Sequence, residues 1–484
     1  MLKNYFCLGV SLLCLGCSVG PDYHRPDKIS DEQIAKSLEL KSNSTNVICK
    51  DWYKQFNDQT LTTLIEKGIT ESPTVKIALS KMKQARYQLF INRAGFLPVF
   101  NLQGTYENSK ENTSGNLSLK NEYYLAGLDA SWEIDIWGGQ RRLTESSKAL
   151  LRSASADYEN VKLSLIAEIA TEYVNWRLAQ KKLEIVEKNL KLQREIFETV
   201  KEQYTAGLTD TLAYEQAQSV LHTTEMKLPQ LKTQEKSAQN SLSVLTGELP
   251  HQLPDEKTNL LDTENKFDMK LLSELPADIV RHRPDVRAAE QKLIAQNALI
   301  GKAIADLFPS VSITALIGYQ NKKLSPLIGS NYDAHSNSAI ISMPLLHWGA
   351  LINQVKIQKE SSIAALEDYQ NTLLSAAADI NNATISVKEE KLRNKAAKAS
   401  MKSTSEILKL SLQKYKNGLI DFSDVLTAEQ NKLSAEQEYL QSTASIYLNI
   451  IGFFKAVGGG FSLNRSIQAC QTDETTAVCA PYTN

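Results

Sequence analysis

The sequence repeats itself at a fixed offset of 211 residues, and no other feature limits the possible folds as strongly. The matches fall on residues that break or anchor secondary structure. They are Pro73 and Pro284, Pro98 and Pro309, Trp137-Gly138 and Trp348-Gly349, Tyr158 and Tyr369, Tyr204 and Tyr415, Gly207 and Gly418, Asp210 and Asp421, and Gly247 and Gly458. Because the copies align without a gap, both hold the same elements in the same order. We therefore expect one structural unit used twice.

Composition and side-chain spacing argue against several function classes. The 484 residues carry a net charge of −1, so the basic face that nucleic-acid binding requires is not indicated. The glycines at 458–460 lack the following Lys and Ser/Thr of a phosphate-binding loop. No metal-ligand spacing or catalytic triad is evident among the histidines, which are His24, His222, His251, His282, His335 and His347. We predict a protein that is not an enzyme and uses no cofactor or metal.

The N-terminus is typical of an exported protein. Residues 1–16 combine a positive start with about a dozen apolar residues, too few to span a membrane as a helix. The run Leu15-Gly16-Cys17 resembles the bacterial lipoprotein signal, which implies lipidation of Cys17, and Ser18 after it favours delivery to the outer membrane. Residues 17–60 would then form a lipid-anchored segment. The alternative is a plain secretory signal with an incidental cysteine.

Three further cysteines would enter an oxidising compartment after export, where disulfides persist. Cys470 and Cys479 could close a small loop, with Cys49 left over, so the sequence leaves the pairing open.

Alternating apolar and polar residues predict four strands, at about 97–107, 123–136, 309–320 and 338–346, joined in pairs by long polar turns. They could form a soluble sandwich or a sheet packed on helices. Strands of about ten residues with aromatic ends instead favour an outer-membrane barrel. Lipid forbids an open sheet edge, and four strands are too few to close a barrel. Two chains would supply eight strands and three chains twelve.

Long helices are predicted at about 145–205, 212–246, 356–416 and 422–457. Apolar residues recur every seven positions from Ile169 to Tyr204, which marks helices packed in a coiled-coil manner. Pro73 and Pro284 would each start a helix, and Gly207 and Gly418 would end the longest ones. The predicted organisation is repeat 1 at 61–250, a linker at 251–271, repeat 2 at 272–460 and a C-terminal tail at 461–484.

Several motifs, taken in order, resemble the TolC-type outer-membrane channel family of tripartite efflux pumps, and its lipoprotein (NodT-like) branch most closely. They are Cys17 to Tyr23, the segment from Trp52 to Ile65, Arg283 to Glu290, Phe308-Pro309, and the helix-tip motif at Tyr204 to Leu208 and Tyr415 to Leu419. The resemblance implies a homotrimer with a twelve-stranded β-barrel continuous with a periplasmic α-barrel. It also implies a periplasmic adaptor and an inner-membrane transporter as partners.

The resemblance places a pore gate at the helix tips. Asp424 matches one inward-facing carboxylate of the family, whereas Thr427 stands where a second Asp is usual. Tyr415 matches a tyrosine that helps to lock the tip, but Ala213 replaces its acidic partner. The helix-tip motif comprises Tyr204, Gly207, Asp210, Tyr415, Gly418 and Asp421. Asp210 and Asp421 are also positioned to act as simple helix caps.

We therefore expect an outer-membrane exit duct that passively conducts small molecules, such as drugs and toxic compounds, from periplasm to exterior. The alternatives are the outer-membrane channel of a type I protein secretion system and a lipid-tethered coiled-coil scaffold. Arg283, Asp285 and Arg287 are expected to form ion pairs that brace a strand–helix junction. The sequence indicates neither the exported compound nor the cognate pump.

Overall fold

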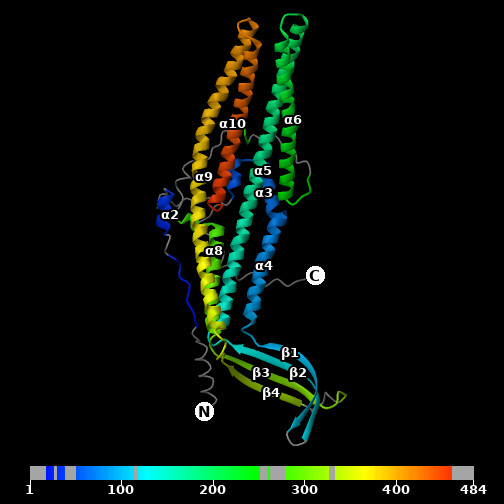
Figure 1. The fold of residues 1–484 in the computed structure, drawn as a ribbon, viewed down its shortest axis with the longest axis vertical. Coiled ribbons are helices and arrows are strands. Elements are labelled where there is room, and N and C mark those ends of the chain that lie inside the picture. Colours follow the sequence, from blue (N-terminus) through cyan, green and yellow to red (C-terminus); the bar gives the residue numbers. More distant parts are fainter. Residues whose placement is uncertain are drawn as a thin grey trace. The chain divides into compact units, whose positions relative to one another are not determined.

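The computed structural model describes residues 18–26, 30–38, 51–113, 117–250, 260–261, 278–325 and 333–459. Its elements, coloured along the chain in Figure 1, are mostly helices with four strands. They are α2 (Asp31–Ser37), η1 (Trp52–Phe56), α3 (Gln59–Glu71), α4 (Pro73–Ala94), β1 (Val99–Thr113), β2 (Leu117–Ile134), α5 (Gly139–Thr205), α6 (Thr211–Leu245), α7 (Ile279–His282), α8 (Pro284–Ala305), β3 (Ser310–Asn321), β4 (Asp333–Ser342), α9 (Ala350–Lys416) and α10 (Phe422–Ala456).

The chain divides into two compact units that do not follow the two repeats. The strand-bearing unit comprises Met1–Pro26, Ser80–Ala156 and Arg287–Asn371, and the hairpin unit comprises Asp27–Leu79, Asp157–Val286 and Thr372–Asn484. Each unit takes corresponding segments from both copies, and α5 and α9 each belong partly to both units. The duplication therefore supplies each unit with two equivalent halves.

The four strands form one antiparallel sheet in the order β1-β2-β3-β4. Its register places Leu102 opposite Leu128, and Leu128 opposite Ile317. Residues that face each other across neighbouring strands point to the same side of a sheet, so these three side chains form an apolar row. All three are exposed, Leu102 by 82%. The predicted alternation thus produces a sheet with an uncovered apolar face.

The first hairpin is longer than the sequence analysis predicts. Residues 108–113 and 117–122, expected as a polar turn, continue the ladder, with Asn108 opposite Glu122 and Thr113 opposite Leu117. Polar side chains do not prevent pairing, because the ladder is made by backbone groups. The interpretation of this polar segment as a turn was wrong over most of its length.

The coiled-coil spacing corresponds to the buried side of α5 in the hairpin unit. Ile169 and Trp176 are fully buried and Leu190 is nearly so, whereas Tyr204 at the end of the helix is exposed. As predicted, α4 begins at Pro73 and α8 at Pro284, since proline at the first helical position removes no hydrogen bond. Among the described helices, none has a stretch long and apolar enough to span a membrane.

Candidate functional site

Two tight turns form the helix tips of the hairpin unit. Gly207 between α5 and α6 has φ +71°, and Gly418 between α9 and α10 has φ +69°. A Cβ added at either position would meet no atom within 4 Å, so a larger side chain would have room there. Glycine is favoured at both positions because the backbone adopts a left-handed conformation, which other residues rarely adopt. Both glycines end their helices as the sequence predicts.

The aspartates after these turns differ between the two copies. The Asp210 carboxylate accepts a hydrogen bond from the backbone N–H of Ala213 at 2.9 Å and so caps α6, as predicted. Asp421 occupies the corresponding position before α10, but its side chain makes no capping hydrogen bond. The prediction of a side-chain cap was therefore wrong for Asp421, and the start of α10 lacks this stabilisation.

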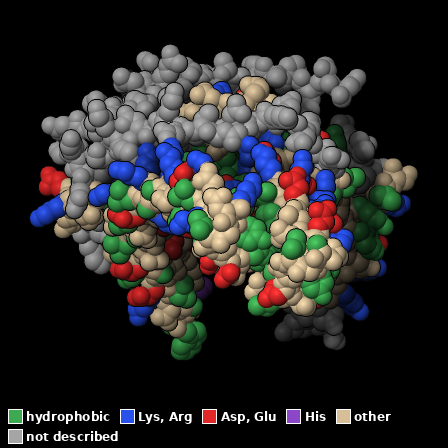
Figure 2. Space-filling view, turned by 90° about the horizontal axis from the view of Figure 1, so that it is seen from above, with side chains coloured by type: hydrophobic (Ala, Val, Ile, Leu, Met, Phe, Trp, Pro, Cys, Tyr) green, Lys and Arg blue, Asp and Glu red, His purple; other side chains and the backbone are tan. Residues whose placement is uncertain are grey.

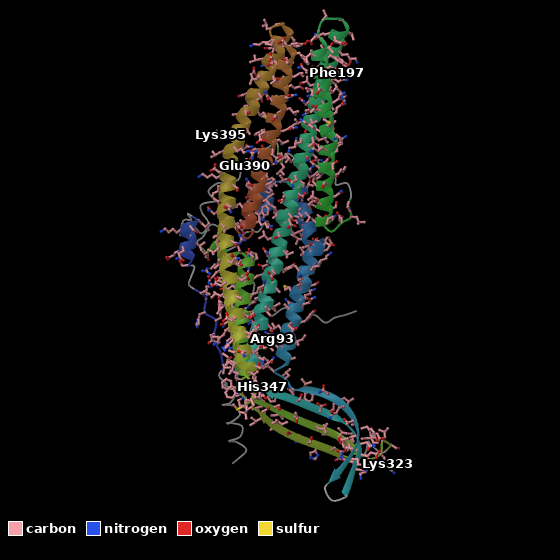
Figure 3. All side chains as sticks on the ribbon, viewed as in Figure 1. Arg93, Phe197, Lys323, His347, Glu390 and Lys395 are labelled. Atoms are coloured by element: carbon pink, nitrogen blue, oxygen red, sulfur yellow. The ribbon has the colours of Figure 1, made fainter. Side chains whose placement is uncertain are left out.

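Aromatic rings pack differently in the two hairpins. Tyr204 stacks on Tyr214 with ring centroids 5.1 Å apart, and Phe197, labelled near the end of α5 in Figure 3, packs on Tyr214 at 5.6 Å. In the second hairpin, Tyr415 contacts Phe422 at 5.5 Å. Each tip is thus braced by its own aromatic contact.

Tyr415 also joins the second hairpin to the first. Its hydroxyl donates a hydrogen bond to Oε1 of Gln203 on α5 at 3.2 Å, and burial raises the pKa of Tyr415. Tyr415 belongs to the predicted helix-tip motif, but its partner Gln203 was not predicted, because the family motif places the partner of this tyrosine at position 213, which is Ala here. The register of α5 against α9, which brings Gln203 into reach, carries no signal in a single sequence.

The two hairpins enclose a groove of about 1000 Å³ at the tips. Its lining includes Gln203, Leu208, Asp210, Tyr415, Ile420 and Phe422. Beneath it lies an apolar cluster built from all four long helices, formed by Val200, Ala217, Leu408, Phe422, Val425, Leu426 and Ala428. Lys and Arg side chains are interspersed with Asp and Glu over the face seen in Figure 2, so no patch of a single charge dominates it.

Asp424 lies in the first turn of α10 and its side chain is exposed. Thr427, at the position where the family usually has a second carboxylate, is exposed one turn later and its hydroxyl donates to the Ser423 carbonyl oxygen at 2.9 Å. The Asp424 side chain is thus open to solvent, and no Lys or Arg in the part of the chain that the structure describes pairs with it.

In the strand-bearing unit, the described N-terminal residues are fixed to the start of α5. The Val19 N–H donates to the Trp137 carbonyl oxygen at 3.1 Å, and the Arg142 guanidinium donates to Asp22 Oδ1 at 2.8 Å and to the backbone oxygens of Val19 and Gly20. Cys17 lies outside the described residues. The next residue, Ser18, packs so closely on Gly138 that a Cβ added to this glycine would overlap Ser18.

The two Trp-Gly pairs are not equivalent. Trp137 stacks on Phe308 with ring centroids 4.6 Å apart, and its indole N–H donates to the Pro309 carbonyl oxygen at 2.8 Å. Trp348 is 88% exposed, with φ +47°. Of the two, Trp348 therefore presents an exposed indole of the kind that suits a lipid–water interface.

The predicted ion pairs of Arg283 form at a different place. Its guanidinium contacts Asp285 at 2.7 Å and Asp379 at 3.1 Å, and it donates to the Ala456 carbonyl oxygen at 2.7 Å. The pairs brace the α7–α8 junction against the end of α10, so the predicted strand–helix junction was wrong. Arg283 lies next to Pro284, which starts α8. The strand β3 follows the other end of this helix, so Arg283 is a whole helix away from the strand.

Known proteins resemble the whole of this arrangement. The outer membrane efflux protein family matches residues 64–248 and 275–459, one match in each repeat. Nodulation protein T of Rhizobium leguminosarum bv. trifolii is 29% identical over 93% of this chain and 96% of its own length. The cation efflux system protein CusC of Escherichia coli K12 is 27% identical over 94% of this chain and 98% of its own.

A solved structure shares the fold as well. The outer-membrane channel OprN superposes with a TM-score of 0.81 at 29% identity, covering 92% of this chain and 99% of that one. The family match covers most of the chain in two copies, in agreement with the 211-residue repeat. The protein belongs to the outer membrane efflux protein family.

Proposed function

We propose that three copies of this chain form the outer-membrane exit duct of a tripartite efflux pump, and that the duct passively conducts small molecules. The observation that carries this is the four-stranded sheet with an exposed apolar face, whose outer strands, β1 and β4, each pair on one side only among the described residues. In water such edges invite aggregation, and in lipid each unpaired backbone group costs several kcal/mol. If β1 and β4 pair with strands of neighbouring chains in a closed barrel, the backbone groups of both edges form hydrogen bonds.

The helices also present a surface suited to another copy. On α9, Leu374, Ile385 and Leu392 are each more than half exposed. Their spacings of eleven and seven residues bring them to one side of the helix. An exposed apolar stripe of this kind is buried when α9 packs against a neighbouring chain. Three chains would then supply twelve strands and twelve long helices, with a periplasmic adaptor and an inner-membrane transporter as partners at the tips.

Asp424 is proposed as the pore gate, because threefold symmetry would bring three carboxylates together at the tips. In planar bilayers the purified protein should conduct ions as a trimer. Asp424→Ala should raise the single-channel conductance and weaken block by multivalent cations by about tenfold, which corresponds to about 1.4 kcal/mol.

Asp424→Glu is the matched control, since it keeps the charge and should keep the block. If the trimer conducts but Asp424→Ala leaves conductance and block unchanged, the gate lies elsewhere. Absence of any conductance would contradict the duct itself.

Lipidation of Cys17 is proposed on the lipoprotein-like signal and on the way residues 18–22 are tied to Trp137 and Arg142. An acyl chain at Cys17 would add membrane affinity of about 0.8 kcal/mol for each buried CH₂ group. Growth with labelled palmitate should label the wild type, and Cys17→Ala should remove the label completely. Cys49→Ala should retain it, and a Cys17→Ala chain that is still labelled would exclude this anchor.

A further inference from the structure

Glu429 is a buried carboxyl group in the helix that carries the proposed gate. It lies on α10 five residues after Asp424 and is 0% exposed. Its neighbours in sequence, Val425, Leu426 and Ala428, belong to the apolar cluster beneath the tip groove. No donor among the described residues reaches hydrogen-bond geometry at either carboxyl oxygen. A carboxylate in such a site carries a large desolvation cost.

The partner helix α5 contributes amides at this level. Gln193 is buried, and its side chain is close enough to Glu429 to favour the charged form of the carboxyl group. Its Oε1 atom accepts no hydrogen bond from the described residues, and the same holds for Oδ1 of Asn189, one turn away on the same face of α5. The site therefore offers hydrogen-bond acceptors that a protonated carboxyl group could satisfy.

Several charged side chains on the surrounding helices are paired with residues other than Glu429. Arg194 of α5 pairs with Glu225 of α6 at 2.9 Å, and Lys409 of α9 pairs with Glu406 at 3.3 Å. On α10 itself, Lys432 pairs with Glu436 at 2.9 Å. Among the described residues, Lys432 is the cation whose charge acts on the Glu429 carboxyl group. Burial outweighs the effects of Gln193 and Lys432 and raises the pKa of Glu429 to about 7.

We propose that Glu429 is a proton-dependent latch of the tip: when protonated it holds α10 against α5, and when deprotonated it favours separation of the two helices and opening of the gate. The neutral carboxyl group can donate its O–H to the Gln193 amide oxygen and carries no charge to bury. The carboxylate has no direct counterion, and separation of α10 from α5 lets water reach it. This inference rests on the proposed channel and names the regulation of its gate.

The direction of the pH dependence follows from proton binding. The packed state binds a proton more tightly than the open state, in which the carboxyl group regains its ordinary pKa of 4.5. Packing is therefore fully stable below about pH 4.5 and loses stability as the pH rises to about 7. Between pH 5.5 and 8.5 the open-to-packed ratio should increase roughly 30-fold.

Amide hydrogen exchange of the reconstituted trimer tests the latch without relying on conductance. After correction for the intrinsic rate, exchange in residues 422–433 should rise about 30-fold between pH 5.5 and 8.5 in the wild type. Glu429→Gln, which is isosteric and neutral, should remove this rise and keep low-pH protection throughout. Glu202→Gln, which removes an exposed carboxylate of α5, should behave as the wild type.

Conductance measurements separate the possible outcomes. In planar bilayers the open probability should follow the exchange, and Glu429→Gln should make it independent of pH. A rise in exchange that survives Glu429→Gln, or its absence in the wild type, would overturn the latch. A loss of all conductance with the exchange pattern intact would instead refute the channel.

Discussion

Trp52→Ala is expected to lower the free energy of unfolding of the hairpin unit by about 3–5 kcal/mol, because it removes a large, fully buried aromatic side chain and leaves a cavity in the core. Trp52 is 0% exposed and stacks on Phe454 with ring centroids 4.9 Å apart. Tyr53 and Phe56 meet the same indole edge-on at 6.2 and 6.0 Å. Thermal unfolding in detergent, followed by circular dichroism at 222 nm, measures the loss.

Trp52→Phe is the matched control. It keeps an aromatic ring on Phe454 and removes an indole N–H that has no hydrogen-bond partner among the described residues. The cost should be less than about 1.5 kcal/mol, since most of the volume is retained and an unpaired donor is lost. Equal unfolding temperatures for Trp52→Ala and the wild type would show that the indole is not part of the core's stability.

The Trp52 contact also shows which features a sequence can predict. Prolines, glycines and seven-residue spacing act over a few turns, so the starts of α4 and α8, the turns at Gly207 and Gly418, and the buried side of α5 follow from local patterns. Contacts between distant segments do not. The stacking of Trp52 on Phe454 depends on how the chain folds between η1 and α10, and no short-range sequence pattern predicts that path.

The residues of the candidate site likewise fall into those that local sequence motifs predict and those that depend on packing between helices. The sequence placed Asp424 in the first turn of α10 and Tyr415 at the tip, because both belong to motifs that are contiguous along the chain. Gln203 and Glu429 were missed. The hydrogen bond of Gln203 requires the register of α5 against α9. Glu429 lies on the buried side of α10, seven residues after Phe422, but a glutamate in a helix is ordinarily exposed.

The two copies have also diverged where their tips differ in structure. Asp210 caps its helix and Asp421 does not, and Tyr415 bonds to the other hairpin while Tyr204 stacks on Tyr214 of its own. Identical residues at the repeat offset thus make different contacts because their surroundings differ, since Val425 stands at the position in the second copy that Tyr214 holds in the first. This divergence removes a side-chain cap from the start of α10 that α6 keeps, which suits a helix proposed to carry the gate.

Asp285→Ala is expected to destabilise the hairpin unit by about 2–3 kcal/mol, because it leaves the buried Arg283 guanidinium with fewer partners. The Arg283 side chain is 10% exposed, and Asp285 holds it through two hydrogen bonds, of 3.1 and 2.7 Å. Asp379 would retain one contact, at 3.1 Å, which limits the loss. The same guanidinium donates to the Ala456 carbonyl oxygen, so the end of α10 should fray in hydrogen exchange as well.

The effect of this substitution should depend on pH. Burial alone would raise the pKa of Asp285, but the hydrogen bonds and charge of Arg283 outweigh it and lower the pKa below the ordinary 3.8. The wild type therefore keeps this stabilisation above about pH 4 and loses it as the pH falls through the lowered pKa. The difference in unfolding temperature between wild type and Asp285→Ala should be full at pH 7 and shrink in strong acid. Asp285→Asn is the matched control, because it keeps the shape of the side chain but removes its charge. If Asp285→Asn is as stable as the wild type at pH 7, shape and neutral hydrogen bonds hold the end of α10, and the ion pair does not.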